Sequence, residues 1–254
     1  MRTHLLTWLA GIADAAGFAA RVVVEGLRPP YERRELVRQL FELGVRSVPL
    51  IAAAGFAIGL VLSMHTRSSL ARFGAEALIP AGLAIALVRE TGPLTAGLLL
   101  SGRIGAGIGA ELGAMKVTEQ IDALEAVGVD SFRYLVVTRV AACVIALPLL
   151  TTLMNFTGML GGFAAESAIT GMTFRTYFQQ AFSPIDFSDL IPATLKTTVF
   201  GFIIATVAAY LGVHTAQGTE GVGRAATRAV VTGSMLLIAV NVLLVRLISV
   251  VIPE

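Results

Sequence analysis

Charged side chains are scarce in this sequence. Only 14% of its 254 residues are Asp, Glu, Lys or Arg, whereas soluble domains average about 25%. Hydrophobic residues make up 56%, and the mean hydropathy is +0.80. This balance excludes an ordinary soluble domain and predicts an integral membrane protein. The net charge of +2 is too small to indicate a nucleic-acid partner.

Cysteine and histidine are also rare. The one cysteine, Cys143, cannot form an internal disulfide, and it lies in an apolar run where we expect it to pack. The three histidines, His4, His65 and His214, are far apart in the sequence, and no pair of them has metal-ligand spacing. We therefore expect no metal site.

The motifs of an ATPase are missing. No G-x-x-x-x-G-K-[ST] loop is present, because neither Lys116 nor Lys196 follows a glycine. The glycine-rich stretch at 217–231 follows a membrane span rather than a strand, so it does not indicate a dinucleotide site. Nucleophile elbows and HExxH motifs are missing as well. Any ATP hydrolysis must come from another polypeptide, and we expect this chain to be no enzyme and to hold no cofactor.

Long apolar runs dominate what is present. A membrane helix needs about 20 apolar residues, and the sequence has five candidate runs, at 48–64, 77–115, 134–164, 190–213 and 229–252. Before them, apolar residues recur at helical spacing from Leu5 to Leu27, which predicts an amphipathic helix on the bilayer surface. A helix packed on a soluble domain is the alternative. We thus predict an all-α polytopic membrane protein, with an N-terminal interfacial segment at 1–46 and five transmembrane helices within 47–254.

Lysine and arginine are unevenly distributed between the loops. They concentrate in the N-terminal segment, after the second run and before the fifth, whereas the opposite loops have only Arg67, Arg72 and Arg175. Cytoplasmic loops carry the excess of these residues. We expect a cytoplasmic N-terminus and a C-terminus outside.

Charge interrupts the second apolar run at LVRETGPLTA (87–96). Arg89 stands beside Glu90, and the fourth run contributes Lys196. Ionisable residues at bilayer depth are expensive and indicate a functional site, with a purely structural ion pair as the alternative. Pro93 cannot donate a hydrogen bond to the carbonyl of Arg89, so we expect a kink or a local widening of the helix.

Small residues recur at every fourth position further along the same run. They are Gly97, Ser101, Gly105, Gly109 and Gly113. A stripe of this kind lets helix backbones approach closely in lipid. We expect tight packing within one subunit, which is compatible with a seam that slides or opens.

The segment AMKVTEQIDALEAVGVD (114–130) is amphipathic. As a helix it would have an apolar face with Ile121, Leu124 and Val127, and an acidic face with Glu119, Asp122 and Glu125. Thr118 is placed to cap that helix at its N-terminus. A short exposed helix on the cytoplasmic side is either a docking site for a partner or an ordinary solvated loop helix.

Two stretches have a more specific character. RETGPLTAGLLLSGRIGAGIGAELGAMKVTEQIDALEAVGVD (89–130) resembles the signature region of the MlaE/YrbE permeases, and GTEGVGRAATRAVV (218–231) resembles their loop before the last helix. These permeases are the membrane subunits of Mce-associated ABC transporters. The resemblance extends over most of the chain, from about residue 32 to residue 252, and it agrees with an interfacial helix and five spans.

The resemblance implies a homodimer in the bacterial inner membrane, with a periplasmic C-terminus. Its partners would be a cytoplasmic ATPase that binds ATP and Mg, often a STAS-domain protein, and a periplasmic ring of Mce-domain proteins. The complex would move phospholipid or another hydrophobic lipid between the inner membrane and the outer envelope. The lipid and the direction of transport stay open.

The resemblance also implies roles for residues. The coupling helix of the family, which contacts the ATPase, matches about 117–129 here, with Thr118, Glu119, Ile121, Asp122, Leu124, Glu125 and Gly128. In a lipid pathway we expect Arg89 and Lys196 to hold the phosphate, while Glu90 moderates that binding or forms an ion pair that breaks on opening.

Two functions of other classes compete with this one. A stand-alone ion-coupled secondary transporter of a lipophilic substrate would use the same three charges, although the sequence has no clear inverted repeat. A membrane enzyme would have to use Glu166, Asp186 and Asp189.

Overall fold

The chain folds as a bundle of long helices. The computed structural model describes residues 2–29, 31–216 and 218–251, and these ranges contain no strand. Five helical stretches are long and apolar enough to cross a membrane, namely Arg33–Phe73, Glu76–Val117, Phe132–Thr170, Phe187–Val213 and Gly218–Val250. The predicted all-α membrane fold with five spans is confirmed.

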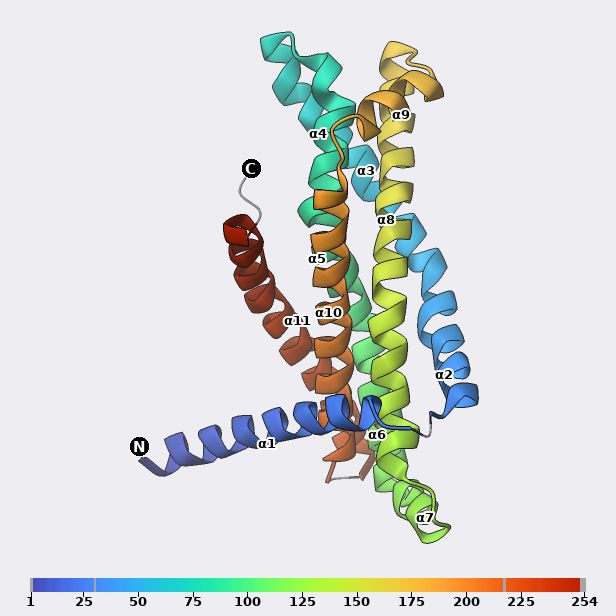
Figure 1. The fold of residues 1–254 in the computed structure, drawn as a ribbon, viewed down its shortest axis with the longest axis vertical. Helices are drawn as coiled ribbons and strands as arrows, with labels where there is room; N and C mark the ends of the chain where they lie inside the picture. Colours follow the sequence, from blue (N-terminus) through green and yellow to red (C-terminus); the bar gives the residue numbers. More distant parts are fainter. Residues whose placement is uncertain (1, 30, 217, 252–254) are drawn as a thin grey trace.

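Several spans are built from shorter segments. The first comprises α2 (Arg33–Gln39), η1 (Leu40–Gly44), η2 (Val45–Ser47), α3 (Val48–Leu70) and η3 (Ala71–Phe73). The second comprises η4 (Glu76–Leu78), α4 (Ile79–Ala86), η5 (Leu87–Thr91), α5 (Gly92–Leu100), η6 (Ser101–Gly105) and α6 (Ala106–Val117). The third consists of η7 (Phe132–Val137) and α8 (Thr138–Thr170), and the last two are α10 (Phe187–Val213) and α11 (Gly218–Val251). In Figure 1, α5, α8 and α10 follow the long axis of the molecule, whereas α11 leans away from them.

The second span widens where its charges lie. η5 is a π-helical turn, and Pro93 follows it at the start of α5. Proline lacks the N–H that a regular α-helix would need at this position, and π-helical turns are frequent at functional sites. The predicted widening of the helix near Pro93 is therefore confirmed.

The N-terminal helix α1 (Arg2–Gly26) lies across one end of the bundle (Figure 1). One side of it contacts the bundle, where Val22 is buried and Phe18 packs edge-on against Phe132. Val23 and Leu27 remain 47% and 74% exposed. An interfacial amphipathic helix needs such an apolar side for the bilayer. The side chains of residues 2–9 and 12 lie outside the described part of this helix.

Glycines bring α3 and α8 into backbone contact. A Cβ atom at Gly59 would lie 1.8 Å from the carbonyl oxygen of Gly158, and one at Gly161 would lie 2.1 Å from that of Phe56. Real Cβ atoms do not come this close to backbone, so any side chain at these positions would push the helices apart. Cys143 is buried in the adjoining core, as its apolar surroundings predict.

The small-residue stripe of the second span faces α10, α11 and the turn between them. A Cβ atom at Gly97 would lie 2.7 Å from a methyl carbon of Leu237, and one at Gly109 would lie 3.2 Å from the Cβ atom of Ala229. The other members lie on the same side, with Gly105 near Ile204, Gly113 near Thr215, and Ser101 hydrogen-bonded to the carbonyl of Val230. Within this subunit the stripe packs closely, and a sliding seam stays a prediction.

A buried carboxylate joins helices at the end of the bundle opposite α1. Glu166 is only 1% exposed, and it accepts hydrogen bonds from the Ser63 hydroxyl at 2.9 Å and from the Arg67 guanidinium. The short helix α9 (Phe174–Phe182) covers this end (Figure 1) and buries Tyr177 completely. Burial, and to a smaller extent the nearby Glu166, raises the pKa of Tyr177 well above its usual range.

Replacing Tyr177 with phenylalanine should leave thermal stability unchanged or raise it slightly. The Tyr177 hydroxyl is buried without a hydrogen-bond partner in the described part of the chain, so its removal relieves a desolvation cost of about 1 kcal/mol or more. Tyr177→Ala should instead lower the free energy of unfolding by about 3 kcal/mol, because it leaves a cavity. Melting temperatures of the two purified variants check this, and a large loss in Tyr177→Phe would reveal a hydrogen bond that the hydroxyl needs.

Candidate functional site

Glu90 and Lys196 form an ion pair between the second and fourth spans. Lys196 Nζ lies 2.7 Å from Glu90 Oε1 and 3.2 Å from the carbonyl oxygen of Arg89. The Lys196 side chain is 2% exposed, whereas that of Glu90 is 45% exposed. The cation of the pair is therefore buried, whereas its carboxylate is partly accessible from outside the protein.

The second contact of Lys196 follows from the backbone of η5. Pro93 has no N–H to offer the carbonyl of Arg89, and the ammonium group of Lys196 donates to this oxygen instead. Asn241 of α11 approaches from the other side, with its Nδ2 atom 3.5 Å from Glu90 Oε2. Residues from the second, fourth and fifth spans thus meet at Glu90.

Arg89 points to a different partner from its neighbour. Its Nε atom donates to Asp189 Oδ1 at 2.7 Å. Asp189 is fixed in turn by its place in the first turn of α10, where its Oδ2 atom accepts from the backbone N–H of Asp186 at 3.1 Å. Adjacent residues on a helix point about 100° apart, so Arg89 and Glu90 each bind α10 rather than each other.

These contacts define the polar notch, by which we mean Arg89, Glu90, Asp189, Lys196 and Asn241. Each of the two ion pairs has one partner that is more than two-fifths exposed, namely Arg89 in the pair with Asp189 and Glu90 in the pair with Lys196. An entering anion could displace Glu90 from Lys196 or Asp189 from Arg89. Beside the notch, between α8 and α10, lies an apolar cavity of about 310 Å³ lined by residues that include Val88, Phe156 and Thr197.

The predicted coupling segment forms α7 (Gln120–Ala126), a helix shorter than the stretch 117–129 that the resemblance implies. It projects beyond α1 at the same end of the bundle (Figure 1). The predicted cap at Thr118 is wrong. Its hydroxyl donates back to the carbonyl of Ala114 at 2.8 Å, and the residue before the helix is Glu119, in a left-handed conformation with φ of 58°. Thr118 ends α6, so its side chain satisfies the preceding helix instead.

The apolar side of α7 divides into an inner and an outer part. Ile121 is buried and Leu124 is partly buried against the core, but Val127 is 75% exposed. The acidic side is tied to its own loop, since Asp122 pairs with Lys116 at 2.9 Å and Glu125 accepts from Ser131 at 2.5 Å. Val127 and Gly128, which has φ of 81°, remain at the exposed tip.

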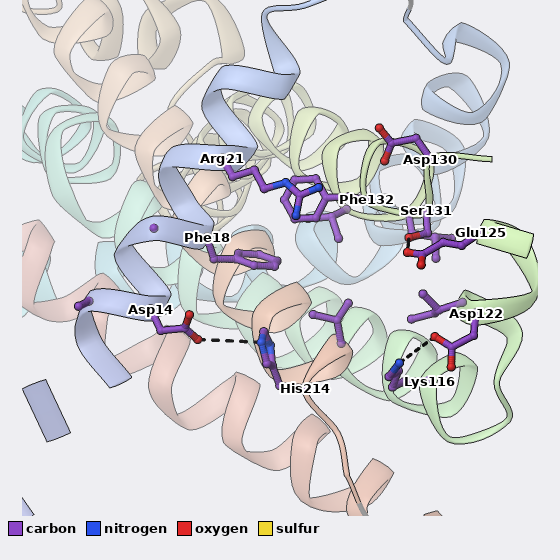
Figure 2. Close-up of a pocket in the computed structure, with 16 residues that line it drawn as sticks. Asp14, Phe18, Arg21, Lys116, Asp122, Glu125, Asp130, Ser131, Phe132 and His214 are labelled. Atoms are coloured by element: carbon purple, nitrogen blue, oxygen red, sulfur yellow. Dashed lines mark hydrogen bonds and ion pairs between the residues drawn. The ribbon is translucent and has the colours of Figure 1, made fainter. Parts of the chain in front are cut away.

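A cavity of about 760 Å³ lies between α1 and the coupling segment (Figure 2). Cations and carboxylates from both elements line it, and Figure 2 shows Arg21 reaching over the ring of Phe132, at 4.1 Å from its centroid. Arg133 binds Glu25 of α1 through its Nε atom at 2.7 Å. The N-terminal helix is therefore attached to the start of the third span, next to the coupling segment.

Comparison with known proteins decides the family. The model of the family described as Permease MlaE matches residues 36–247. This chain belongs to the MlaE permease family. It is 36% identical to a probable ABC transporter permease protein of Rickettsia typhi, over 96% of this chain and 94% of the relative. It is 32% identical to the intermembrane phospholipid transport system permease protein MlaE of Haemophilus influenzae, over 82% of this chain and 80% of that protein.

A plant relative belongs to the same set. The chain is 32% identical to the chloroplastic protein TRIGALACTOSYLDIACYLGLYCEROL 1 of Arabidopsis thaliana, over 84% of this chain and 61% of the relative. The notch and the coupling segment both lie within residues 36–247, which the family model matches. The carboxylates of the membrane-enzyme alternative do not come together, because Glu166 binds Ser63 and Arg67 while Asp189 and Asp186 form the start of α10, where Asp189 binds Arg89.

The sequence alone does not identify two residues of the notch, Asn241 and Asp189. Asn241 is a neutral residue in an apolar helix, so nothing marks it before the helices are packed. Asp189 has a signal, because Asp186 and Asp189 form a capping box at the start of the fourth span. That pattern indicates a helix start and does not disclose the contact with Arg89. Among the described residues, no group of three or more His, Cys, Asp or Glu is placed to hold a metal ion.

Proposed function

We propose that this chain is the permease subunit of an ABC transporter that moves phospholipid or a related lipid between the bacterial inner membrane and the outer envelope. The observation that carries the proposal is the half-open ion pair of Glu90 and Lys196 inside a chain of the MlaE family. A phospholipid has an anionic head and apolar tails. The notch offers cations for the phosphate, and the surrounding apolar helices accept the tails.

In this proposal the chain acts as a homodimer with the N-terminus cytoplasmic and the C-terminus periplasmic. A separate cytoplasmic ATPase, with ATP and Mg, supplies the energy, and a STAS-domain protein and a periplasmic ring of Mce-domain proteins complete the assembly. The projecting coupling segment supports the ATPase contact, because its tip, which is cytoplasmic in the proposed orientation, exposes an apolar side chain.

Val127→Asp should reduce capture of the ATPase by at least about tenfold. The substitution puts a charge on a side chain that is 75% exposed at the tip of the coupling segment, so it should spare the fold and penalise an apolar contact. The measurement is the amount of ATPase that co-purifies with the tagged chain. Phe73→Asp is the matched control. Phe73 is the last residue of the first span and is 83% exposed, so this variant should capture as much ATPase as the wild type.

Reconstitution tests the function as a whole. The purified chain with its ATPase, in liposomes, should transfer labelled phospholipid to an acceptor only when ATP and Mg are present. Transfer by the chain alone, driven by an ion gradient and without ATP, would support the secondary-transporter alternative and overturn this proposal. Chemical conversion of the lipid without its movement would indicate an enzyme.

A further inference from the structure

A second polar cleft lies between the first and second spans, apart from the notch. It has a volume of about 310 Å³ and is lined by side chains that include Arg38, Glu42, Leu43, Arg103, Ile104 and Glu111. Arg103 belongs to η6, the π-helical turn between α5 and α6. The proposed notch mechanism makes no use of this arginine.

The lining itself has two arginines and two glutamates, but with their ion-pair partners Glu35, Arg46 and Arg139 the group has one more cation than carboxylates. Each carboxylate has its own arginine: Glu35 pairs with Arg38 at 2.6 Å, Glu42 with Arg46 at 2.5 Å, and Glu111 with Arg139 at 2.7 Å. Arg103 is the additional cation. Its Nη1 atom donates to the backbone carbonyl of Arg46, and it contacts no carboxylate among the described residues.

The guanidinium of Arg103 keeps most of its hydrogen-bonding capacity. Arginine has five N–H donors in a planar fork, a geometry that suits phosphate, and within the described ranges Arg103 donates to a single backbone carbonyl. The side chain is partly buried, so the surroundings screen its charge less than they would at an open surface. Behind Glu111, the Nε atom of buried Arg139 also lacks a hydrogen-bond partner among the described residues. Arg103 and Arg139 therefore both have N–H donors that no acceptor among the described residues takes up.

The position of the cleft along the span differs from that of the notch. Arg103 is bonded to Arg46, which lies just before α3 begins at Val48. It follows Glu90 by 13 residues, which corresponds to about 20 Å along a helix. If Arg46 lies on the cytoplasmic side, as proposed above, Arg103 lies at the boundary of the cytoplasmic leaflet and the notch lies towards the opposite leaflet.

We propose that this cleft binds the phosphodiester of a phospholipid from the leaflet on the Arg46 side. Arg103 supplies the charge, and Leu43 and Ile104 form apolar walls beneath the headgroup. Phe41 and Val45 are 53% and 54% exposed on the adjoining helix, where they can contact the acyl chains. Basic pockets between membrane helices on the cytoplasmic side are known to take lipid headgroups. The assignment to the cytoplasmic leaflet rests on the proposed orientation, whereas the binding of the phosphodiester does not.

Photolabelling of the full chain tests the cleft separately from the notch. The probe is phosphatidylglycerol with a photoreactive group near its headgroup, added to the purified chain in detergent, and labelled peptides are mapped by mass spectrometry. Labelling of 40–48 and 104–111 reports the cleft, and labelling of 87–93 reports the notch. Arg103→Gln should reduce labelling at the cleft about tenfold, and Arg103→Lys should restore part of it, because a charge-assisted contact is lost and then partly regained.

The control variant is Arg34→Gln, which removes an exposed cation from the same segment outside the cleft and should leave labelling unchanged. Undiminished labelling of the cleft in Arg103→Gln would overturn the proposal. So would competition by excess inorganic phosphate as strong as that by unlabelled phosphatidylglycerol, because the site would then hold a free anion. Dissociation of Arg103→Gln into monomers would assign Arg103 to a contact between copies of the chain. Labelling needs no ATP, so a complex that moves no lipid would refute the proposed function and leave the cleft result standing.

Discussion

Replacing Glu90 with alanine should impair lipid transfer, because the ion pair with Lys196 is lost, and lower the free energy of unfolding by about 3 kcal/mol. The loss of stability comes from the partner that remains. Lys196 is 2% exposed, and without Glu90 the one acceptor left to its ammonium group among the described residues is the carbonyl oxygen of Arg89, at 3.2 Å. A buried cation without a counter-charge is among the most destabilising changes that one substitution can make.

The reverse substitution should cost less. Lys196→Met removes the buried cation and leaves Glu90, which is 45% exposed and lies 3.5 Å from the amide of Asn241. Because Glu90 can regain solvation, we expect a loss of only about 1 kcal/mol. The double variant Glu90→Ala, Lys196→Met should be as stable as Lys196→Met alone, since the unpaired cation is gone.

The double variant also separates a transport role from a structural one. If the pair only holds helices together, the double variant should recover both stability and lipid transfer. If the pair binds lipid, stability returns while ATP-driven transfer in proteoliposomes stays at least about tenfold below the wild-type rate, because Lys196 no longer contributes its charge and Arg89 alone remains for the phosphate. Melting temperatures and transfer rates are measured on the same preparations.

A carboxylate on the same span serves as the control. Glu76 is 47% exposed and contacts Arg67, which keeps its second partner Glu166 when Glu76 is removed. Glu76→Ala should therefore change stability by less than about 1 kcal/mol and leave transfer intact. If Glu90→Ala transferred lipid at the wild-type rate, the notch would not be part of the lipid pathway.

The five spans follow from the sequence because lipid imposes a strict rule. A chain that crosses hydrocarbon must satisfy every backbone N–H and C=O internally, so an apolar run of sufficient length has to be helical. The widening at η5 was equally accessible, because Pro93 removes a donor within such a run. In both cases the cause is local, and the sequence displays it directly.

The partners of the notch charges could not be found in this way. Lys196 and Glu90 are 106 positions apart, and no local pattern says that α10 brings them together. The incorrect cap at Thr118 has the same origin. Its hydroxyl could accept a hydrogen bond from an N–H group of α7 or donate one to a carbonyl of α6. Because the chain turns at Glu119, the hydroxyl donates to the carbonyl of Ala114.

Glycine spacing in the sequence does not say where two helices approach most closely. The stripe from Gly97 to Gly113 is longer in sequence. Among the described glycines, however, an added Cβ atom would come closest to the backbone of another span at Gly59, whose motif GFAIG has only one repeat. Across the stripe, the groups within 4 Å of an added Cβ are mainly side chains, which can shift. At Gly59 the nearest group is the backbone of Gly158. The spacing of small residues therefore predicts that helices pack closely, but it does not predict which helix–helix contact is the tightest.

Gly59→Ala should consequently be one of the most damaging single substitutions in the chain, with a loss of at least about 3 kcal/mol. The new Cβ atom would lie 1.8 Å from the carbonyl oxygen of Gly158, and neither backbone can move without separating α3 from α8. That separation would also disturb Ser63 on α3 and Glu166 on α8, which are hydrogen-bonded at 2.9 Å. The expected result is a low yield of folded protein and a strongly reduced melting temperature.

Gly82→Ala is the matched substitution, because nothing lies within 4 Å of a Cβ atom at that position. Alanine has the higher helix propensity by up to about 1 kcal/mol, so Gly82→Ala should be neutral or stabilising while Gly59→Ala unfolds. Equal melting temperatures for the two variants would mean that α3 and α8 can separate at little cost. The contact would then be a joint that moves during transport, whereas the predicted difference makes α3 and α8 a rigid unit on one side of the notch.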